Sequence, residues 1–192
     1  MNTQEAQLRV LCLTMNPSVD LATETERVVP THKLRCGDTL HDAGGGGINV
    51  ARVLTRLGGE CTSLCPTGGS AGHWLETRMR EEGIPSVFLP IADETRVSFT
   101  VHEHSTGAEF RFVMPGPHLS EAEWMACLQH LESLSDFPDL VVASGSLPPG
   151  VPADFYARVA RLCHQRGDGL QRAGVVVGRR VEALAPERLA FS

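Results

Sequence analysis

DAGGGGINVAR, residues 42–52, places four consecutive glycines directly before a helical pattern. Beyond the glycines, apolar side chains recur at the spacing of one helix face, at Val50, Val53, Leu54 and Leu57. Consecutive glycines let a ligand approach the backbone closely and expose amide N–H groups, which suits a polyhydroxylated or anionic molecule. A flexible loop that only caps the helix has the same spacing, so both interpretations stay open.

Strand and helix patterns alternate along the chain on both sides of this stretch. Apolar, β-prone runs predict strands, and apolar residues at helical spacing predict helices. The predicted strands span 8–16, 61–66, 86–91 and 139–147, and the predicted helices follow the glycines up to residue 57 and span 70–82, 120–134 and 153–166. Ser120 and Glu123 stand in capping-box spacing at the start of the third helix. The alternation predicts an α/β fold with a parallel sheet and helices on its faces.

Two polar segments with strand character interrupt this alternation. Within 96–104, apolar residues alternate with polar ones, and the alternation returns at Phe110 and Phe112 after a turn. This pattern predicts a β-hairpin with one solvated face. An earlier segment is similarly polar and β-prone. We expect the two segments, about 19–43 and 96–116, to pair into a small separate sheet that serves as a lid.

Composition limits the classes of partner. The chain has 192 residues, 42% of them hydrophobic, and a formal net charge of −6. Nucleic-acid affinity depends on clustered cations, and the longest basic run is Arg179-Arg180, so we expect a small-molecule partner and no nucleic acid. The sequence has neither a secretory leader nor an apolar run of membrane-spanning length. We therefore expect a cytoplasmic protein that does not associate with membranes.

The six cysteines and eight histidines do not have the spacing of a metal site. Neither a C-x-x-C pair nor an H-E-x-x-H motif occurs. The cysteines are scattered through apolar stretches, so we interpret them as buried free thiols. No metal-ligating residue is predicted.

Four colinear motifs between residues 10 and 166 carry a family resemblance. They are NPSVD at 16–20, GGGGINVAR at 44–52, RFVMPG at 111–116 and SGSLPPG at 144–150, together with Gly58, Gly68 and Gly69. In these motifs the chain resembles the N-terminal part of the PfkB, or ribokinase-like, family of carbohydrate kinases, and it is most similar to the phosphofructokinase branch. The resemblance implies a Rossmann-like ribokinase fold, with a parallel sheet and a small β lid, truncated at the C-terminus.

The resemblance also implies a set of sugar-binding residues. Asp20 would accept hydrogen bonds from sugar hydroxyls, and its alternative role is to cap a turn. Gly45, Gly46 and Gly47 would bring the backbone against the sugar. Asn49 would bind a hydroxyl, and it could also serve as a helix N-cap.

Three further residues are implied near the phosphate and at a strand end. Lys33 and Arg96 match the family's cations for the sugar phosphate, although a solvated loop lysine would explain Lys33 as well. Arg96 stands on the polar face of the predicted hairpin. Ser146 follows a buried strand, where open α/β sheets bind ligands, and its alternative role is that of a turn serine before two prolines.

Three function hypotheses follow. The resemblance implies ATP-dependent phosphorylation of a ketohexose phosphate, with ATP and Mg²⁺ as cofactors and a homodimer formed through the lid. Fructose 6-phosphate is the leading substrate, and tagatose 6-phosphate and fructose 1-phosphate are the alternatives. A second hypothesis is a module that binds a sugar phosphate or dimerises without chemistry. The third, a nicotinamide-dependent oxidoreductase, is disfavoured because Asn49 stands where G-x-G-x-x-G requires its last glycine.

The motifs that carry catalysis in the family do not occur in the sequence. The family's aspartate base lies in a G-A-G-D segment, and no G-x-G-D is present, so no catalytic residue is assigned. The family's N-x-x-E is matched only by Asn2 and Glu5 at the N-terminus. Residues 167–192 show little periodicity. We expect 1–166 to be the N-terminal part of a sugar-kinase domain and 167–192 to be a non-matching tail of a frameshifted or truncated product, inactive by itself.

Overall fold

A five-stranded sheet forms the centre of the molecule, in a computed structural model that describes residues 8–166 and 174–178. The strand order is β5-β4-β1-β8-β9, and every neighbouring pair is parallel. The strands are β1 (Val10–Leu13), β4 (Cys61–Thr67), β5 (Ser86–Pro90), β8 (Leu140–Ser144) and β9 (Gly174–Gly178). The predicted parallel α/β sheet is therefore confirmed.

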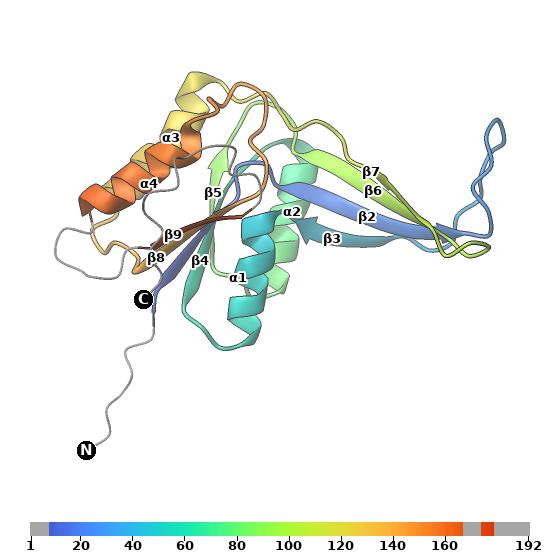
Figure 1. The fold of residues 1–192 in the computed structure, drawn as a ribbon, viewed down its shortest axis with the longest axis horizontal. Coiled ribbons are helices and arrows are strands. Elements are labelled where there is room, and N and C mark those ends of the chain that lie inside the picture. Colours follow the sequence, from blue (N-terminus) through green and yellow to red (C-terminus); the bar gives the residue numbers. More distant parts are fainter. Residues whose placement is uncertain (1–7, 167–173, 179–192) are drawn as a thin grey trace, which may run out of the picture.

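Two pairs of helices cover the two faces of this sheet (Figure 1). The pairs are α1 (Gly46–Arg56) with α2 (Gly69–Glu81), and α3 (Glu121–Ser133) with α4 (Phe155–Arg166). Successive side chains of β1 point to opposite faces. Leu11 and Leu13 pack with the side chains of α3 and α4, whereas Val10 and Cys12 pack with those of α1 and α2.

Helix α3 begins at the position that the capping-box spacing predicted, with Ser120 as its N-cap residue. The Ser120 hydroxyl accepts a hydrogen bond from the Glu123 backbone N–H at 3.4 Å, and the Glu123 carboxylate accepts one from the Ser120 backbone N–H at 2.7 Å. Glu123 also accepts a hydrogen bond from the Ala92 backbone N–H at 2.6 Å. The hydrogen bond from the Ser120 side chain is the main reason that the pKa of Glu123 is lowered.

A second sheet of four strands forms the lid, in the order β3-β2-β6-β7. Its strands are β2 (Ser18–Thr25), β3 (Leu40–Gly44), β6 (Arg96–Glu103) and β7 (Glu109–Phe112). β2 pairs with β6 in parallel, and β3 and β7 extend the sheet on either side in antiparallel pairs. The predicted pairing of the two polar segments is confirmed. The lid extends sideways from the body (Figure 1).

The strand order of the central sheet reverses between β1 and β8. From β1 the chain adds β4 and β5 on one side, and it then returns to place β8 and β9 on the other. In open α/β sheets, ligands bind at the carboxyl ends of the strands beside such a reversal. Asn16 follows β1 and Gly145 follows β8 at this point.

One strand lies where the sequence pattern predicted no element. β9 pairs with β8 from Leu140 opposite Gly174 to Ser144 opposite Gly178. Its sequence, GVVVG, is too short to show a period, and the strands of parallel sheets need not alternate apolar with polar residues. The rest of the predicted tail, 167–173 and 179–192, lies outside the described residues.

The six cysteines are free, and five of them are buried as predicted. The prediction was wrong for Cys36, which is exposed because it lies in the connection between β2 and β3. Burial raises the pKa of Cys127 to about 12 and that of Cys163 to about 11. These thiols are therefore protonated at neutral pH.

In residues 8–166 and 174–178, no group of three or more histidine, cysteine, aspartate or glutamate side chains is arranged to hold a metal ion. None of the helices in the same ranges has the length and hydropathy needed to cross a bilayer.

Candidate functional site

A cavity of about 560 Å³ lies between the lid and the glycine stretch. Residues that are paired across neighbouring strands share one face of a sheet. Asp20 is paired with both Ser98 and Asp42, and this row of three polar side chains lines the cavity. From the body, Gly45 and Gly46 line the cavity at the start of α1. Polar side chains of the lid and the backbone at the start of α1 therefore face one shared cavity.

The glycine stretch brings α1 close to the ends of β1 and β8. A Cβ on Gly46 would lie 2.3 Å from Ser144 Oγ, and a Cβ on Gly47 would lie 2.6 Å from the Leu13 carbonyl oxygen. Gly45 has a φ of 133°, a backbone conformation that residues with a side chain rarely adopt. Gly47 is buried and does not line the cavity, so its observed role is in packing, and its contact with the sugar stays a prediction.

The N-terminus of α1 is capped by Thr14, the residue that follows β1. Its N-cap residue, Gly45, has no side chain, and the Thr14 hydroxyl accepts a hydrogen bond from the Ile48 backbone N–H at 2.9 Å. The helix dipole adds partial positive charge at this end, beside the cavity. Asn49 lies inside α1, so its alternative role as the N-cap is wrong.

Asp20 supplies a carboxylate to the cavity. The Ser18 hydroxyl donates a hydrogen bond to Asp20 Oδ1 at 2.6 Å, and Asp20 is exposed on the face of β2 that lines the cavity. Because Asp20 lies within a strand, the alternative interpretation as a turn-capping residue is wrong.

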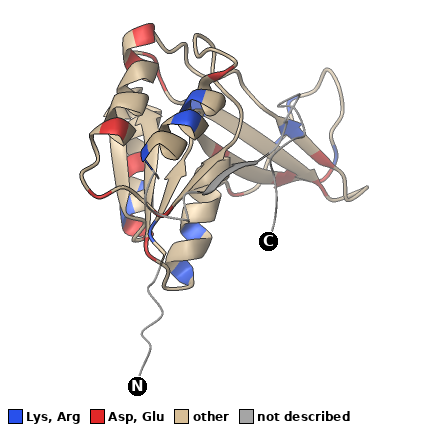
Figure 2. Cartoon of the chain, turned by 60° about the vertical axis from the view of Figure 1, so that its left-hand side comes forward, with Lys and Arg blue, Asp and Glu red and all other residues tan. Residues whose placement is uncertain are grey.

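Arg96 supplies a cation to the same cavity from the adjoining strand β6. Its guanidinium donates hydrogen bonds to the backbone carbonyls of Asn16 at 3.2 Å and Met114 at 3.3 Å. Burial lowers the pKa of Arg96 and the negative charge of Asp20 raises it, and an arginine remains charged at neutral pH. Figure 2 shows that the lid carries residues of both charge signs.

Lys33 and Ser146 lie apart from this cavity. Lys33 is exposed in the connection between β2 and β3, which lies at the far end of the lid (Figure 1), and it does not line the cavity. Ser146 accepts a hydrogen bond from the Asn16 amide at 3.1 Å and lines a second cavity of about 990 Å³. Arg111 lines both cavities. Of the eight predicted site residues, the first cavity therefore brings together five, Asp20, Gly45, Gly46, Asn49 and Arg96.

Sequence reasoning missed three residues at this site. The strand register places Asp42 opposite Asp20, and it places Arg111 opposite Thr100. Arg52 contacts Asn49. The sequence could have predicted this contact, because residues three apart on one helix are neighbours. No local sequence pattern predicted the strand register of the lid.

Comparison with known proteins identifies the family of the chain. A family model described as "pfkB family carbohydrate kinase" matches residues 13–181, which extends past the domain boundary expected at 166. The "ATP-dependent 6-phosphofructokinase isozyme 2" of Mycobacterium tuberculosis strain H37Rv is 50% identical over 161 residues, which are 84% of this chain and 48% of that protein. The isozyme 2 of Escherichia coli K12 is 38% identical over 160 residues, 83% of this chain and 52% of that protein. The chain spans about half the length of these curated relatives.

Solved structures agree with this relationship. A crystal structure of phosphofructokinase-2 from Escherichia coli in complex with fructose-6-phosphate superposes with a TM-score of 0.78 at 35% identity, over 91% of this chain and 56% of that chain. Ribokinase from Giardia lamblia has a TM-score of 0.70 at 14% identity, over 92% of this chain and 56% of that chain, which shows a common fold. The chain belongs to the pfkB family of carbohydrate kinases.

Proposed function

We propose that this chain binds fructose 6-phosphate between its lid and the start of α1, as the sugar-binding part of an ATP-dependent phosphofructokinase. The observation that carries the proposal is the arrangement of Asp20 and Arg96, which lie on adjoining strands and line one cavity with Asn49. A carboxylate accepts hydrogen bonds from sugar hydroxyls, and a guanidinium binds phosphate. The name of the relatives at 50% and 38% identity supports the choice of sugar.

The residues in the cavity would have separate roles. Asp20 accepts hydrogen bonds from sugar hydroxyls, Arg96 binds the phosphate, and the Asn49 amide forms a hydrogen bond with the sugar. Gly45 and Gly46 allow the sugar to approach the positive end of α1. The lid reduces the access of water, which would otherwise compete with the sugar for a phosphoryl group.

ATP and Mg²⁺ are the cofactors that the family relationship supports, with ATP supplying the phosphoryl group. Within the part of the chain that the structure describes, no cluster of side chains is arranged to hold a metal ion. No step of phosphoryl transfer is assigned to the residues of the cavity.

A second candidate is a module that binds the sugar phosphate without chemistry. It is favoured by the fact that the polar residues assigned to the first cavity, Asp20, Asn49 and Arg96, all suit sugar binding. A coupled assay of ATP consumption with fructose 6-phosphate, run beside calorimetry of sugar binding, separates the two candidates. Turnover supports the kinase, and binding without turnover supports the module. Tagatose 6-phosphate and fructose 1-phosphate serve as competing ligands in both measurements.

Replacing Arg96 with alanine is expected to weaken fructose 6-phosphate binding about tenfold and to change fructose binding little, because the phosphate is the only group of the ligand that the guanidinium would bind. Calorimetry with both sugars measures the difference. Arg35→Ala is the matched control, since Arg35 is an exposed arginine outside the cavity. An equal loss for both sugars would remove the assigned role from Arg96.

We also propose that two copies of the chain pair through the lid. Val97 and Phe99 are each 37% exposed and Phe112 is 43% exposed, and the rings of Phe99 and Phe112 stack with centroids 4.6 Å apart. Apolar side chains on an exposed sheet favour association. A structure of phosphofructokinase-2 from Escherichia coli is described as a tetramer, which supports self-association in the family.

Light scattering at micromolar concentration is expected to give the mass of a dimer, and Phe99→Asp is expected to give a monomer. Leu57→Asp is the control, because Leu57 is 79% exposed at the end of α1, away from the lid. A monomeric unaltered chain would contradict the proposal.

A further inference from the structure

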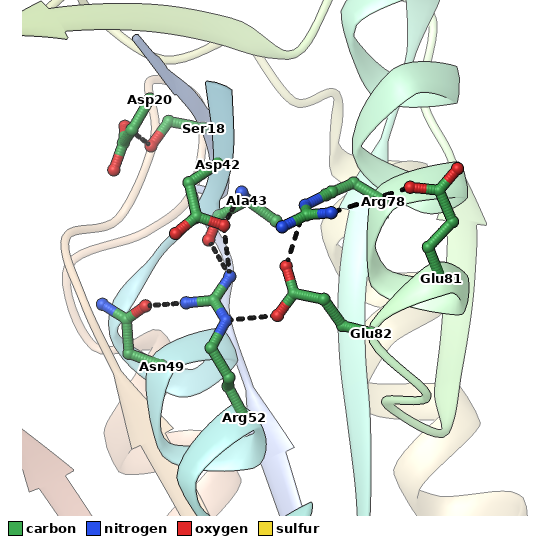
Figure 3. Close-up of polar contacts among 9 residues, drawn as sticks. All are labelled: Ser18, Asp20, Asp42, Ala43, Asn49, Arg52, Arg78, Glu81 and Glu82. Atoms are coloured by element: carbon green, nitrogen blue, oxygen red, sulfur yellow. Dashed lines mark hydrogen bonds and ion pairs between the residues drawn. The ribbon is translucent and has the colours of Figure 1, made fainter. Parts of the chain in front are cut away.

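Arg52 lies at the centre of a polar network beside the cavity (Figure 3). Only 8% of the residue is exposed. Its guanidinium donates four hydrogen bonds, to Glu82 Oε2 at 2.5 Å, Asn49 Oδ1 at 2.7 Å, Asp42 Oδ1 at 3.1 Å and the Ala43 carbonyl at 2.6 Å. Three of these partners, Asp42, Ala43 and Asn49, also line the cavity, and Asp42 and Asn49 do so with polar side chains. The network therefore joins a buried cation to two polar groups of the candidate site.

The contact with Arg52 decides which end of the Asn49 amide faces the cavity. A guanidinium has only hydrogen-bond donors, so the atom of Asn49 that faces it has to be the amide oxygen. The amide nitrogen then lies on the side away from Arg52 (Figure 3). An amide held in this way offers a donor to the cavity, whereas Asp20 offers an acceptor. The two side chains are thus complementary in what they can bind.

We propose that Arg52 is a positioning residue for sugar recognition, which holds the Asn49 amide so that its nitrogen donates to an oxygen atom of the bound sugar phosphate. The same guanidinium fixes Asp42 and the Ala43 carbonyl, and it thereby sets the backbone that leads into the glycine stretch. This inference rests on the proposed function, because it requires a sugar phosphate in the cavity.

Arg52 also has a structural role, which the experiment has to separate from the positioning role. Glu82 is the C-cap residue of α2, and only 10% of its side chain is exposed. Arg52 is therefore one of the links between α1 and α2. Arg78 pairs with the same Glu82 carboxylate at 3.1 Å, but its other ion pair is with Glu81 and not with a residue of the cavity (Figure 3). If the role of Arg52 were purely structural, its replacement would change the stability of the chain by the same amount whether or not Asn49 is present.

The test is a double-mutant cycle in the 192-residue chain, with Arg52→Lys and Asn49→Ala measured singly and together. Calorimetry gives the affinity for fructose 6-phosphate, and thermal unfolding gives the stability. Arg52→Lys is expected to weaken binding about tenfold when Asn49 is present and by a clearly smaller factor in the Asn49→Ala chain, where only its contacts with Asp42 and Ala43 are lost. The same loss of affinity in both backgrounds, or no loss in either, would overturn the positioning role.

Two further variants keep the inference testable if Arg52→Lys does not fold. Asn49→Asp retains the oxygen that Arg52 holds and removes the amide donor, so it is expected to lose as much affinity as Asn49→Ala, and full affinity would overturn the inference.

Arg78→Lys is the matched control, expected to stay within about twofold of the unaltered chain because Arg78 is not a cavity residue. A loss equal to that of Arg52→Lys would show that only the helix contact matters. Absence of binding by the unaltered chain would contradict the proposed function itself, whereas binding without coupling contradicts only the role of Arg52.

Discussion

Asp20→Ala is expected to weaken the binding of fructose 6-phosphate by at least about 100-fold, because each hydrogen bond to a charged group contributes about 1.5 to 3 kcal/mol and the carboxylate can accept from two sugar hydroxyls. The side chain lies on the lid face that lines the cavity, and the Ser18 hydroxyl donates to its Oδ1 at 2.6 Å. That hydrogen bond orients the carboxylate before the sugar arrives. Calorimetry on the 192-residue chain measures the change.

Asp38→Ala is the matched control for Asp20. It removes one negative charge from the same lid region, and Asp38 is exposed and does not line the cavity. Asp20→Asn keeps one acceptor oxygen, so its affinity is expected to lie between those of the unaltered chain and Asp20→Ala. An unchanged dissociation constant for Asp20→Ala would show that the carboxylate does not bind the sugar.

Gly47→Ala is expected to lower the free energy of unfolding by about 2 to 3 kcal/mol, through overpacking between α1 and β1. The added Cβ would lie 2.5 Å from Thr14 Oγ1 and 2.6 Å from the Leu13 carbonyl oxygen. The carbonyl belongs to the central strand and cannot move without disturbing the sheet. Thr14 also caps α1 through the Ile48 N–H, so displacing its hydroxyl would weaken that cap. Urea unfolding followed by circular dichroism measures the loss.

Gly37→Ala is the control for this substitution. A Cβ on Gly37 would meet the flexible side chain of Glu24, with Cγ at 3.3 Å, and both residues are exposed in the lid. The change in unfolding free energy is expected to stay within about 0.5 kcal/mol. A free energy of unfolding of the Gly47→Ala chain equal to that of the unaltered chain would contradict the packing role assigned to Gly47.

Local sequence patterns were sufficient to predict most of the fold. Hydrophobic periodicity predicted the alternation of strands and helices because a buried face repeats at the period of its element. The capping box at Ser120 and Glu123 fixed the start of α3 because both hydrogen bonds form within one turn. The two polar, β-prone segments predicted the lid, whose four strands pair as a separate sheet.

The site was less predictable, because its residues meet through strand register and long connections. Asp42 lines the cavity through its pairing with Asp20, and no local pattern encodes that pairing. Lys33 was predicted near the phosphate from a family position, and the structure leaves it exposed in the connection between β2 and β3, outside the residues that line the cavity. Gly47 stands in the same glycine run as Gly46 but packs against the carbonyl of Leu13.

The most direct test of the central claim is calorimetric titration of the 192-residue chain with fructose 6-phosphate, with fructose as the comparison. The account predicts saturable binding of one sugar phosphate per chain, with fructose at least about tenfold weaker because Arg96 then has no phosphate to hold. Saturable binding that the Asp20→Ala chain loses would place the sugar in the cavity beneath the lid. No binding by a folded, unaltered chain, or equal affinity for the two sugars, would contradict the account.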